Sequence, residues 1–188
     1  MADIMDSKLE YIKGRGGRIL DIGATEKQSL REFFTGLNYK TLDMEPTGGA
    51  DYIADAHSIP TPDAHFDSVI AFSLIEHTHS PHIVVKEIHR VLKPGGVAFT
   101  STPFIHPYHP GRCPDYYRFT KDGLRYLFKD FSSVEVYSDG GLFLALTYFI
   151  PPGLRPLRTI IKPVFTLLDT LFTKNRSSAH QLMVFARK

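Results

Sequence analysis

The sequence predicts an α/β fold in which helices cover both faces of a doubly wound, mostly parallel sheet. Short apolar runs alternate along the chain with helix-like segments, and this succession is typical of parallel strands joined by right-handed crossovers. One run, FDSVIAF at 66–72, is almost continuously apolar, as expected of a central strand buried on both faces. The length of 188 residues, 43% of them hydrophobic, suits one domain spanning 1–188 with its own core.

Several segments have the composition of strands and are separated by turn-forming residues. The first stops at Gly23, and the second stops at acidic residues followed by Pro46 and two glycines. The predicted strands are 18–22, 39–43, 52–54, 66–72, 97–102, 134–137 and 182–186.

Three further segments are helix-like, of which the first is 29–34. The clearest begins at Ser80, a suitable N-cap, with Pro81 at the first helical position. Its apolar residues repeat at three- and four-residue spacing and form one stripe, before residues 93–96 end the helix: Val84, Val85, Ile88, Val91 and Leu92. Thr120 is the expected cap of a third helix, whose apolar face comprises Leu124, Leu127 and Phe128.

Composition excludes several classes of protein. The formal net charge is +2 and no basic patch is interleaved with aromatic residues, so we expect no nucleic acid as partner. The single cysteine, Cys113, excludes an intrachain disulfide and a cysteine-based zinc site. The N-terminal segment has acids where a signal peptide is basic, which predicts a cytoplasmic protein.

Acidic residues end the first two predicted strands, at the edge of the sheet where ligands bind in this architecture. Asp21 is followed by Gly23, whose backbone can approach a ligand closely, and Asp43 ends the second strand. A carboxylate at this position can accept hydrogen bonds from both hydroxyls of a ribose, which favours a nucleoside site. The alternative is structural, because an Asp before a turn glycine is often only a cap.

Five motifs occur in an order that resembles one enzyme family. Between residues 18 and 104 the chain contains RILDIG, YKTLDMEP, DYIADAHSIP, FDSVIAFSLIEH and RVLKPGG. This ordered set resembles the class I S-adenosylmethionine-dependent methyltransferases, specifically the group labelled methyltransferase type 11. The resemblance implies a Rossmann-like, seven-stranded sheet whose last strand is antiparallel. It also implies S-adenosyl-L-methionine as cofactor and transfer of its methyl group to a small acceptor.

The resemblance assigns the cofactor site residue by residue, beginning with the first two strands. Asp21 and Gly23 are placed against the methionine end of the cofactor. Asp43 is placed on the ribose diol, with Met44 packed on the adenine.

The next two strands complete this implied site. Asp55 and Ala56 match the pair that meets the adenine edge. Ser73 and Leu74 match positions that line the cofactor near the transferred methyl. His77 matches the histidine of a Glu-His pair after the fourth strand, and we expect it on the substrate side.

The first loop departs from the family pattern. Thr25 and Lys27 stand where the family usually has the second and third glycines of Gly-x-Gly-x-Gly. Since S-adenosylmethionine carries no phosphate, the loop need not cradle one, and Lys27 can face the methionine carboxylate. The alternative function is a non-catalytic S-adenosylmethionine-binding protein, or pseudoenzyme, with a degenerate glycine loop.

The segment 103–119 follows the fifth predicted strand, where this architecture places the acceptor, and it combines proline with polar and aromatic residues. We expect His106 or His109 to act as general base toward an acceptor hydroxyl, since imidazole titrates near neutral pH. Asp115 is expected to orient that histidine or to bind the hydroxyl itself. These three are the candidate catalytic residues.

The same segment supplies candidate substrate contacts. Arg118 can hold an acidic group, while Tyr116 and Tyr117 can stack on a sugar or an aromatic ring. The run HPxxxPDYYRFT resembles a segment of bacterial methyltransferases associated with glycan biosynthesis, which favours a sugar hydroxyl as acceptor. The structural alternative is that this segment is a lid over the domain and that its histidines are solvated.

Nine histidines raise the question of a metal site. His77, His79 and His82 lie close in sequence, and His106 and His109 follow later. Metal ligation needs converging geometry and supporting partners, and His79 and His82 fall at a helix start where exposed histidines are ordinary. The sequence alone therefore predicts no metal.

The segment 141–172 is an apolar, basic insertion between the last two predicted strands. Arg155, Arg158 and Lys162 stand against one acid, Asp169, and the apolar residues flank a centre interrupted by proline. One interpretation is an interfacial segment that makes a peripheral contact with the inner membrane surface. Packing on the sheet and a homodimer contact are the alternatives.

Overall fold

Seven strands form one sheet in the computed structural model of the chain, which describes residues 4–24, 29–46, 49–172 and 179–188. Their spatial order is β3-β2-β1-β4-β5-β7-β6, with β7 antiparallel to β5 and β6 and the other pairs parallel. The predicted α/β class, including the antiparallel last strand, is confirmed. The strands are β1 (Arg18–Ile22), β2 (Asn38–Asp43), β3 (Tyr52–Ile53), β4 (Phe66–Phe72), β5 (Leu92–Pro103), β6 (Ser133–Asp139) and β7 (Gln181–Arg187).

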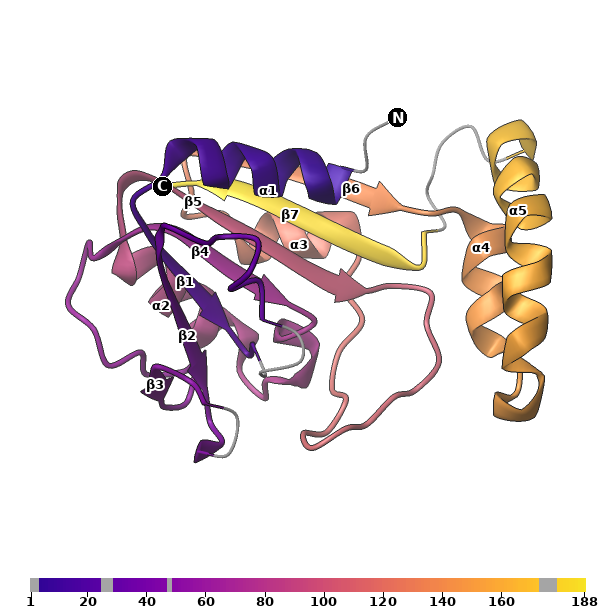
Figure 1. Cartoon of the computed structure of the whole chain (residues 1–188), viewed down its shortest axis with the longest axis horizontal. Coiled ribbons are helices and arrows are strands. Elements are labelled where there is room, and N and C mark those ends of the chain that lie inside the picture. The colour runs from indigo at the N-terminus through magenta and orange to yellow at the C-terminus, as the bar shows by residue number, and fades with distance from the viewer. Residues whose placement is uncertain (1–3, 25–28, 47–48, 173–178) are drawn as a thin grey trace.

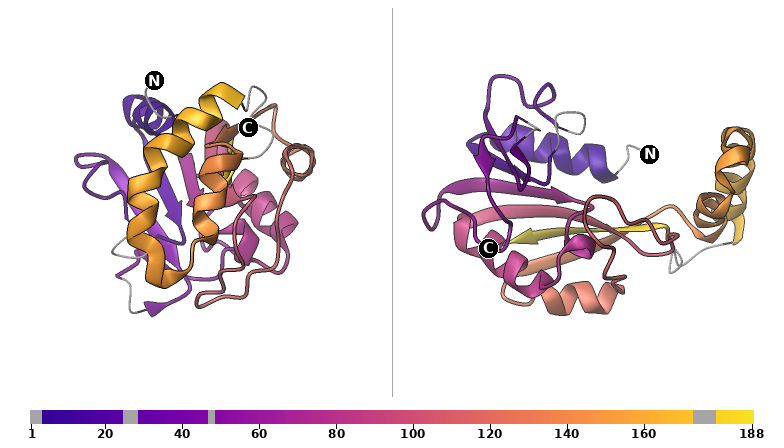
Figure 2. Two further views of the ribbon diagram at one scale, coloured as in Figure 1. Left: turned by 90° about the vertical axis from the view of Figure 1, so that its right-hand side faces the viewer. Right: turned by 90° about the horizontal axis from the view of Figure 1, so that it is seen from below.

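Helices cover both faces of this sheet (Figures 1 and 2). The helix α1 (Ile4–Arg15) lies on one face, and α2 (Pro81–Val91) and α3 (Lys121–Leu127) lie on the other. Ile12 of α1 packs in one apolar cluster with Ile70 of β4, whereas Ile88 of α2 packs in a second cluster with Val69. Neighbouring residues of β4 serve different clusters because side chains alternate across a strand. This explains why its sequence is almost continuously apolar.

The starts of α2 and α3 follow the sequence signals. Pro81 occupies the first turn of α2 after Ser80, although the Ser80 side chain makes no capping hydrogen bond and instead lies 2.8 Å from His79 Nδ1. The Thr120 hydroxyl accepts a hydrogen bond of 3.0 Å from Gly123 N and caps α3 as predicted.

One predicted helix is wrong, and one strand is longer than predicted. Residues 31–36 form turns rather than continuing a helix over 29–34, since the Thr35 hydroxyl binds Glu32 O and Gly36 adopts a left-handed φ of 84°. The strand expected at 97–102 begins at Leu92. Residues 93–96 form a bulge where β5 pairs with β4. Leu92 lies opposite Phe66, and Val97 lies opposite Ser68, so five residues of β5 advance along two of β4.

Between β6 and β7 the chain forms a helical unit beyond one end of the sheet (Figure 1). The unit contains α4 (Leu142–Leu146), two 3-10 turns (Thr147–Phe149 and Pro152–Leu154) and α5 (Arg155–Phe172). The Asp169 carboxylate joins the two helices, because it accepts hydrogen bonds of 2.9 Å from the amides of Phe143 and Leu144. Among the described residues, no helix has the length and hydropathy needed to cross a membrane.

The apolar stripe of α5 is exposed instead of packing on the sheet. Its members recur at spacings of three and four residues and are 44–72% exposed: Leu157, Ile160, Val164, Leu167 and Leu171. A surface helix of a monomer normally buries such a stripe. The expectation that these residues pack on the sheet is therefore wrong, which leaves the membrane and dimer alternatives.

Candidate active site

A cavity of about 1100 Å³ lies at the edge of the sheet where β1, β2, β3 and β4 end. Every predicted cofactor-binding residue lines it: Asp21, Gly23, Asp43, Met44, Asp55, Ala56, Ser73 and Leu74. His77, His106, His109 and Tyr116 line it as well, whereas Asp115, Tyr117 and Arg118 lie outside its wall. Most of the candidate residues named from the sequence therefore lie around one cavity, whereas Thr25 and Lys27 lie outside the described residues.

At the end of β1, the Asp21 carboxylate is buried and accepts a hydrogen bond from the hydroxyl of Tyr39. The Tyr39 oxygen in turn accepts a hydrogen bond of 3.0 Å from Leu30 N. Burial raises the pKa of Asp21 to about 7, although the bond from Tyr39 opposes this. Near neutral pH the carboxyl thus sits between its two protonation states, and a cationic ligand group would favour the ionised one.

The backbone approaches the cavity closely at two turns. Gly23 has a φ of 79°, and its amide donates a 2.7 Å hydrogen bond to Leu42 O. A Cβ at this position would lie 3.1 Å from a methyl carbon of Leu74, so a side chain here would be crowded as well as strained. Ser73 also has a left-handed φ, 48°, which is unusual without glycine and is common at ligand sites.

Asp43 and Asp55 both stabilise turns with one carboxylate oxygen. Asp43 Oδ1 accepts a hydrogen bond of 2.9 Å from Glu45 N, and Asp55 Oδ1 accepts one of 2.8 Å from His57 N. Although partial burial opposes it, the hydrogen bonds from His57 hold the pKa of Asp55 below its ordinary value. No described residue forms a hydrogen bond with Oδ2 of either side chain, so capping a turn and binding a ligand are compatible.

Opposite these carboxylates, the loop between β5 and α3 is organised by a buried ion pair. Arg118 donates two hydrogen bonds to Asp115, one of them 2.6 Å long at Oδ2, and a third of 3.1 Å to Pro107 O. Asp115 Oδ2 also accepts a hydrogen bond of 3.0 Å from His109 N and lies 3.1 Å from His109 Nδ1. The guanidinium holds the pKa of Asp115 well below its usual range. Of its two expected roles, Asp115 therefore suits orientation of His109 rather than direct contact with a hydroxyl.

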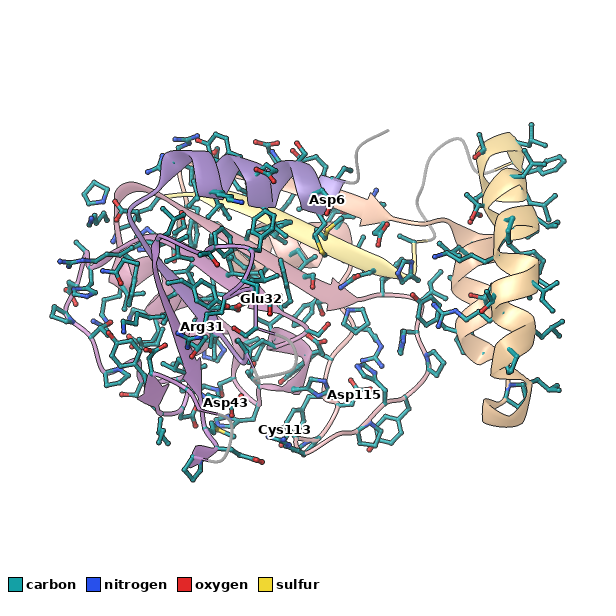
Figure 3. All side chains as sticks on the ribbon, viewed as in Figure 1. Asp6, Arg31, Glu32, Asp43, Cys113 and Asp115 are labelled. Carbon is teal, nitrogen blue, oxygen red and sulfur yellow. The ribbon has the colours of Figure 1, made fainter. Side chains whose placement is uncertain are left out.

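The same loop is fixed to the residues that follow β4. The backbone oxygen of Glu76 accepts hydrogen bonds from Tyr116 N and Tyr117 N, at 2.9 and 3.2 Å. His77 Nδ1 lies 2.9 Å from Pro114 O, and Arg112 forms a 2.6 Å ion pair with Glu45 beyond β2. Figure 3 labels Cys113 and Asp115 on this loop and Asp43 at the end of β2, and Cys113 and Asp43 both line the cavity. The loop consequently closes the cavity with histidine and tyrosine side chains.

Three lining residues come from chain segments for which the sequence predicted no role in this site. Tyr148, from the helical unit, stacks on His180 with ring centres 4.8 Å apart and lies 5.0 Å from the ring of His106. His180 and Gln181 stand at the start of β7. Because β7 is antiparallel, its start meets the edge where the parallel strands end, so the predicted topology already contained a signal for these two.

Burial lowers the pKa of His106 and His180 below the ordinary histidine value. Both rings are then neutral at pH 7, with one unprotonated nitrogen. Burial acts in the opposite sense on Glu76, whose pKa it raises to about 7. The cavity thus contains neutral bases on the side opposite Asp43 and Asp55.

Comparisons with known proteins agree with this arrangement. Residues 20–100 match the model of a family described as a methyltransferase domain. Over 54 residues the chain is 46% identical to a protein of Mycolicibacterium smegmatis named a probable S-adenosylmethionine-dependent methyltransferase, covering 29% of this chain and 21% of that protein. Over 45 residues it is 56% identical to the ubiquinone/menaquinone biosynthesis C-methyltransferase UbiE of Laribacter hongkongensis, covering 23% and 18%. The matched part spans about a fifth of the length of these curated relatives.

Two solved structures share the fold over nearly the whole chain. A SAM-dependent methyltransferase of Archaeoglobus fulgidus superimposes with a TM-score of 0.67 at 14% identity, covering 98% of this chain and 91% of that one. Phosphoethanolamine N-methyltransferase 2 of Haemonchus contortus, in complex with S-adenosyl-L-methionine, superimposes with a TM-score of 0.62 at 17% identity. The match covers 97% of this chain and 52% of that one. With the family match, these results confirm the predicted resemblance to class I, type 11 methyltransferases and the cofactor it implies.

Replacing Asp21 by Asn is expected to change how stability depends on pH. Because burial raises its pKa in the folded state, the stability that this carboxyl contributes is full below about pH 4 and is lost as the pH rises through about 7. The free energy of unfolding falls by about 1.4 kcal/mol for each unit by which the folded-state pKa exceeds the unfolded-state pKa. Asp21→Asn has no titrating carboxyl at this position and should not show this fall. Urea unfolding at about pH 5 and pH 8 measures it. Wild type should lose more stability than the variant between these values, and equal losses would show that Asp21 does not titrate as assigned.

Proposed function

With this resemblance as premise, we propose that the protein transfers a methyl group from S-adenosylmethionine to a hydroxyl of a small acceptor, such as a sugar or a glycan-related metabolite. The observation that carries the proposal is the shared cavity. It joins every predicted cofactor residue to four histidines on the opposite side, His77, His106, His109 and His180. Cofactor and acceptor can therefore occupy one shared cavity.

The residues at the strand ends suit S-adenosylmethionine. A buried carboxyl at Asp21, with its raised pKa, complements the ammonium group of the methionine end. The free oxygen of Asp43 is available for the ribose hydroxyls, and Met44, 52% exposed, provides an apolar surface for adenine. Asp55 and Ala56 complete this wall at the next strand. These roles follow the family pattern at matching positions.

The histidine side of the cavity supplies the chemistry that an acceptor hydroxyl requires. When bound, S-adenosylmethionine provides an electrophilic methyl group and a neutral thioether as leaving group. His106, neutral because burial lowers its pKa, accepts the hydroxyl proton on its free ring nitrogen. His109 is held by Asp115, and Tyr116 offers a ring on which a sugar can stack. Alignment of the two reactants accounts for most of the remaining rate enhancement.

The helical unit makes a peripheral membrane contact in this proposal, at the inner membrane surface. The exposed stripe of α5 lies on the same unit as Tyr148, which lines the cavity. Lys162 lies on α5, and Arg158 packs its guanidinium 3.8 Å from the centre of the Tyr148 ring. An acceptor carried on a lipid would thus be presented beside the cavity wall. A homodimer that buries this stripe is the alternative.

Asp43→Ala should weaken binding of S-adenosylhomocysteine by tenfold or more, because a charge-assisted hydrogen bond contributes about 1.5–3 kcal/mol. Isothermal titration calorimetry on the folded variant measures this. Asp63→Ala is the matched control, since Asp63 is 78% exposed and does not line the cavity. Equal affinities for wild type and Asp43→Ala would refute the ribose assignment.

His106→Gln should bind S-adenosylhomocysteine normally yet lose about 10²–10⁴-fold in turnover, as expected when a general base is removed. Product formation with a panel of sugar acceptors measures turnover, and His82→Gln on the exposed side of α2 is the control. For wild type, kcat/KM should rise with pH through a value below 6.5 and then level off, since burial lowers the pKa of the base. A variant with wild-type turnover would exclude His106 as the base.

The α5 proposal predicts binding to vesicles that contain anionic lipid, and release by salt. A double variant, Ile160→Ser with Val164→Ser, should remain in the supernatant on sedimentation because it interrupts the exposed stripe. Thr159→Ser is the control, since it lies on the same helix outside the stripe. Failure of wild type to sediment at low salt, together with a dimer mass in light scattering, would favour the homodimer.

A further inference from the structure

One buried carboxylate beside the cavity has no hydrogen-bond partner in the described part of the chain. Glu76 is fully buried just after β4, and neither of its side-chain oxygens has a hydrogen bond with a described residue. The hydroxyl of Thr102 influences this carboxylate but is itself buried without a partner in hydrogen-bond geometry. Buried carboxylates normally have hydrogen bonds, a counter-ion or a metal. Glu76 therefore points to a cation that binds there.

Two histidines converge on this carboxylate. Glu76, His77 and His109 each offer one ligand atom, and these three atoms lie within 4.8 Å of one another. Ligand atoms around one transition-metal ion lie about 3–4 Å apart, because the bonds are about 2.0–2.2 Å long. Small side-chain rotations are enough to close the difference. His77 and His109 were among the histidines considered from the sequence, whereas Glu76, the third member of the cluster, was not.

The outer partners expected of metal-bound histidines are also in place. His77 Nδ1 lies 2.9 Å from Pro114 O, so Nδ1–H can donate there and leave Nε2 free for a metal. His109 Nδ1 lies 3.1 Å from Asp115 Oδ2, 3.2 Å from Pro107 O and 3.2 Å from the guanidinium of Arg118. A carboxylate or carbonyl behind the imidazole fixes its tautomer and raises its basicity as a ligand.

We propose that Glu76, His77 and His109 bind a divalent first-row transition-metal ion, such as Zn²⁺, Mn²⁺ or Fe²⁺. Two imidazoles and one carboxylate suit these ions, whereas Mg²⁺ and Ca²⁺ prefer oxygen ligands. The nearby cation Arg118 is already neutralised by its ion pair with Asp115, which leaves the charge of Glu76 for the metal. Converging geometry and outer partners were the two requirements that the sequence alone did not show.

The role of the ion rests on the proposed function. His77 and His109 line the cavity, so the remaining coordination positions of the ion face the space assigned to the acceptor. An acceptor oxygen bound there would be oriented toward the methyl group, and its hydroxyl would have a lower pKa. His106, whose ring centre is 4.6 Å from that of His109, is close enough to take the proton. The ion would thus assist the neutral base rather than replace it.

The test titrates Co²⁺ into protein freed of metal with a chelator and follows the visible absorption of the bound ion. Wild type should bind one equivalent, and His109→Gln and Glu76→Gln should each bind at least tenfold more weakly. His82→Gln and His65→Gln, which remove histidines outside the cluster, should match wild type. If Glu76→Gln fails to fold, as judged by thermal unfolding, His109→Gln decides. The absence of an absorption band in wild type, or equal affinity in His109→Gln, would overturn the proposal.

Binding of S-adenosylhomocysteine to the metal-free protein separates the two proposals. Metal binding without binding of the nucleoside would leave the metal site standing and contradict the methyltransferase proposal. Binding of S-adenosylhomocysteine without binding of metal would contradict the metal site and leave the methyltransferase proposal standing.

Discussion

The acceptor side of the site depends on the hydrogen bonds and the ion pair that the buried carboxylate of Asp115 makes. It is only 1% exposed at its side chain, and it pairs with Arg118 while accepting the amide of His109. A proline-rich loop has few backbone donors of its own, so this pair adds to the hydrogen bonds that join the loop to Glu76 O and holds the backbone around His109. Arg118 extends the effect by binding Pro107 O. The loop is therefore positioned by charge and hydrogen bonding more than by apolar packing.

The site combines two kinds of support. The cofactor side is built on strand ends, where Asp21 and Asp43 are held by the sheet, and such positions are rigid because both faces of the sheet are covered. The acceptor side is assembled from a loop, the start of β7 and Tyr148 of the helical unit. The curated matches cover only part of the chain, while the solved structures share its fold over nearly the whole length.

Much of the fold was predictable because strands and amphipathic helices leave local periodic patterns. The helix predicted at 29–34 failed since a run of six residues propagates poorly and Gly36 ends it at once. That the candidate cofactor residues line one cavity was predictable, because their motifs are contiguous in sequence and follow neighbouring strands. The convergence of Glu76 with His109 was not, because it depends on how a loop without periodicity folds back onto the end of β4. Tyr148 was missed because its position depends on how the helical unit packs beside His180 and His106.

The most direct test of the central claim is a crystal structure of the protein with S-adenosylhomocysteine bound. The account predicts the ribose hydroxyls at the free oxygen of Asp43 and the adenine between Met44 and Asp55. It also predicts the sulfur facing the space in front of His106 and His109. A ligand bound elsewhere on the protein, or one whose sulfur points away from the histidines, would contradict it.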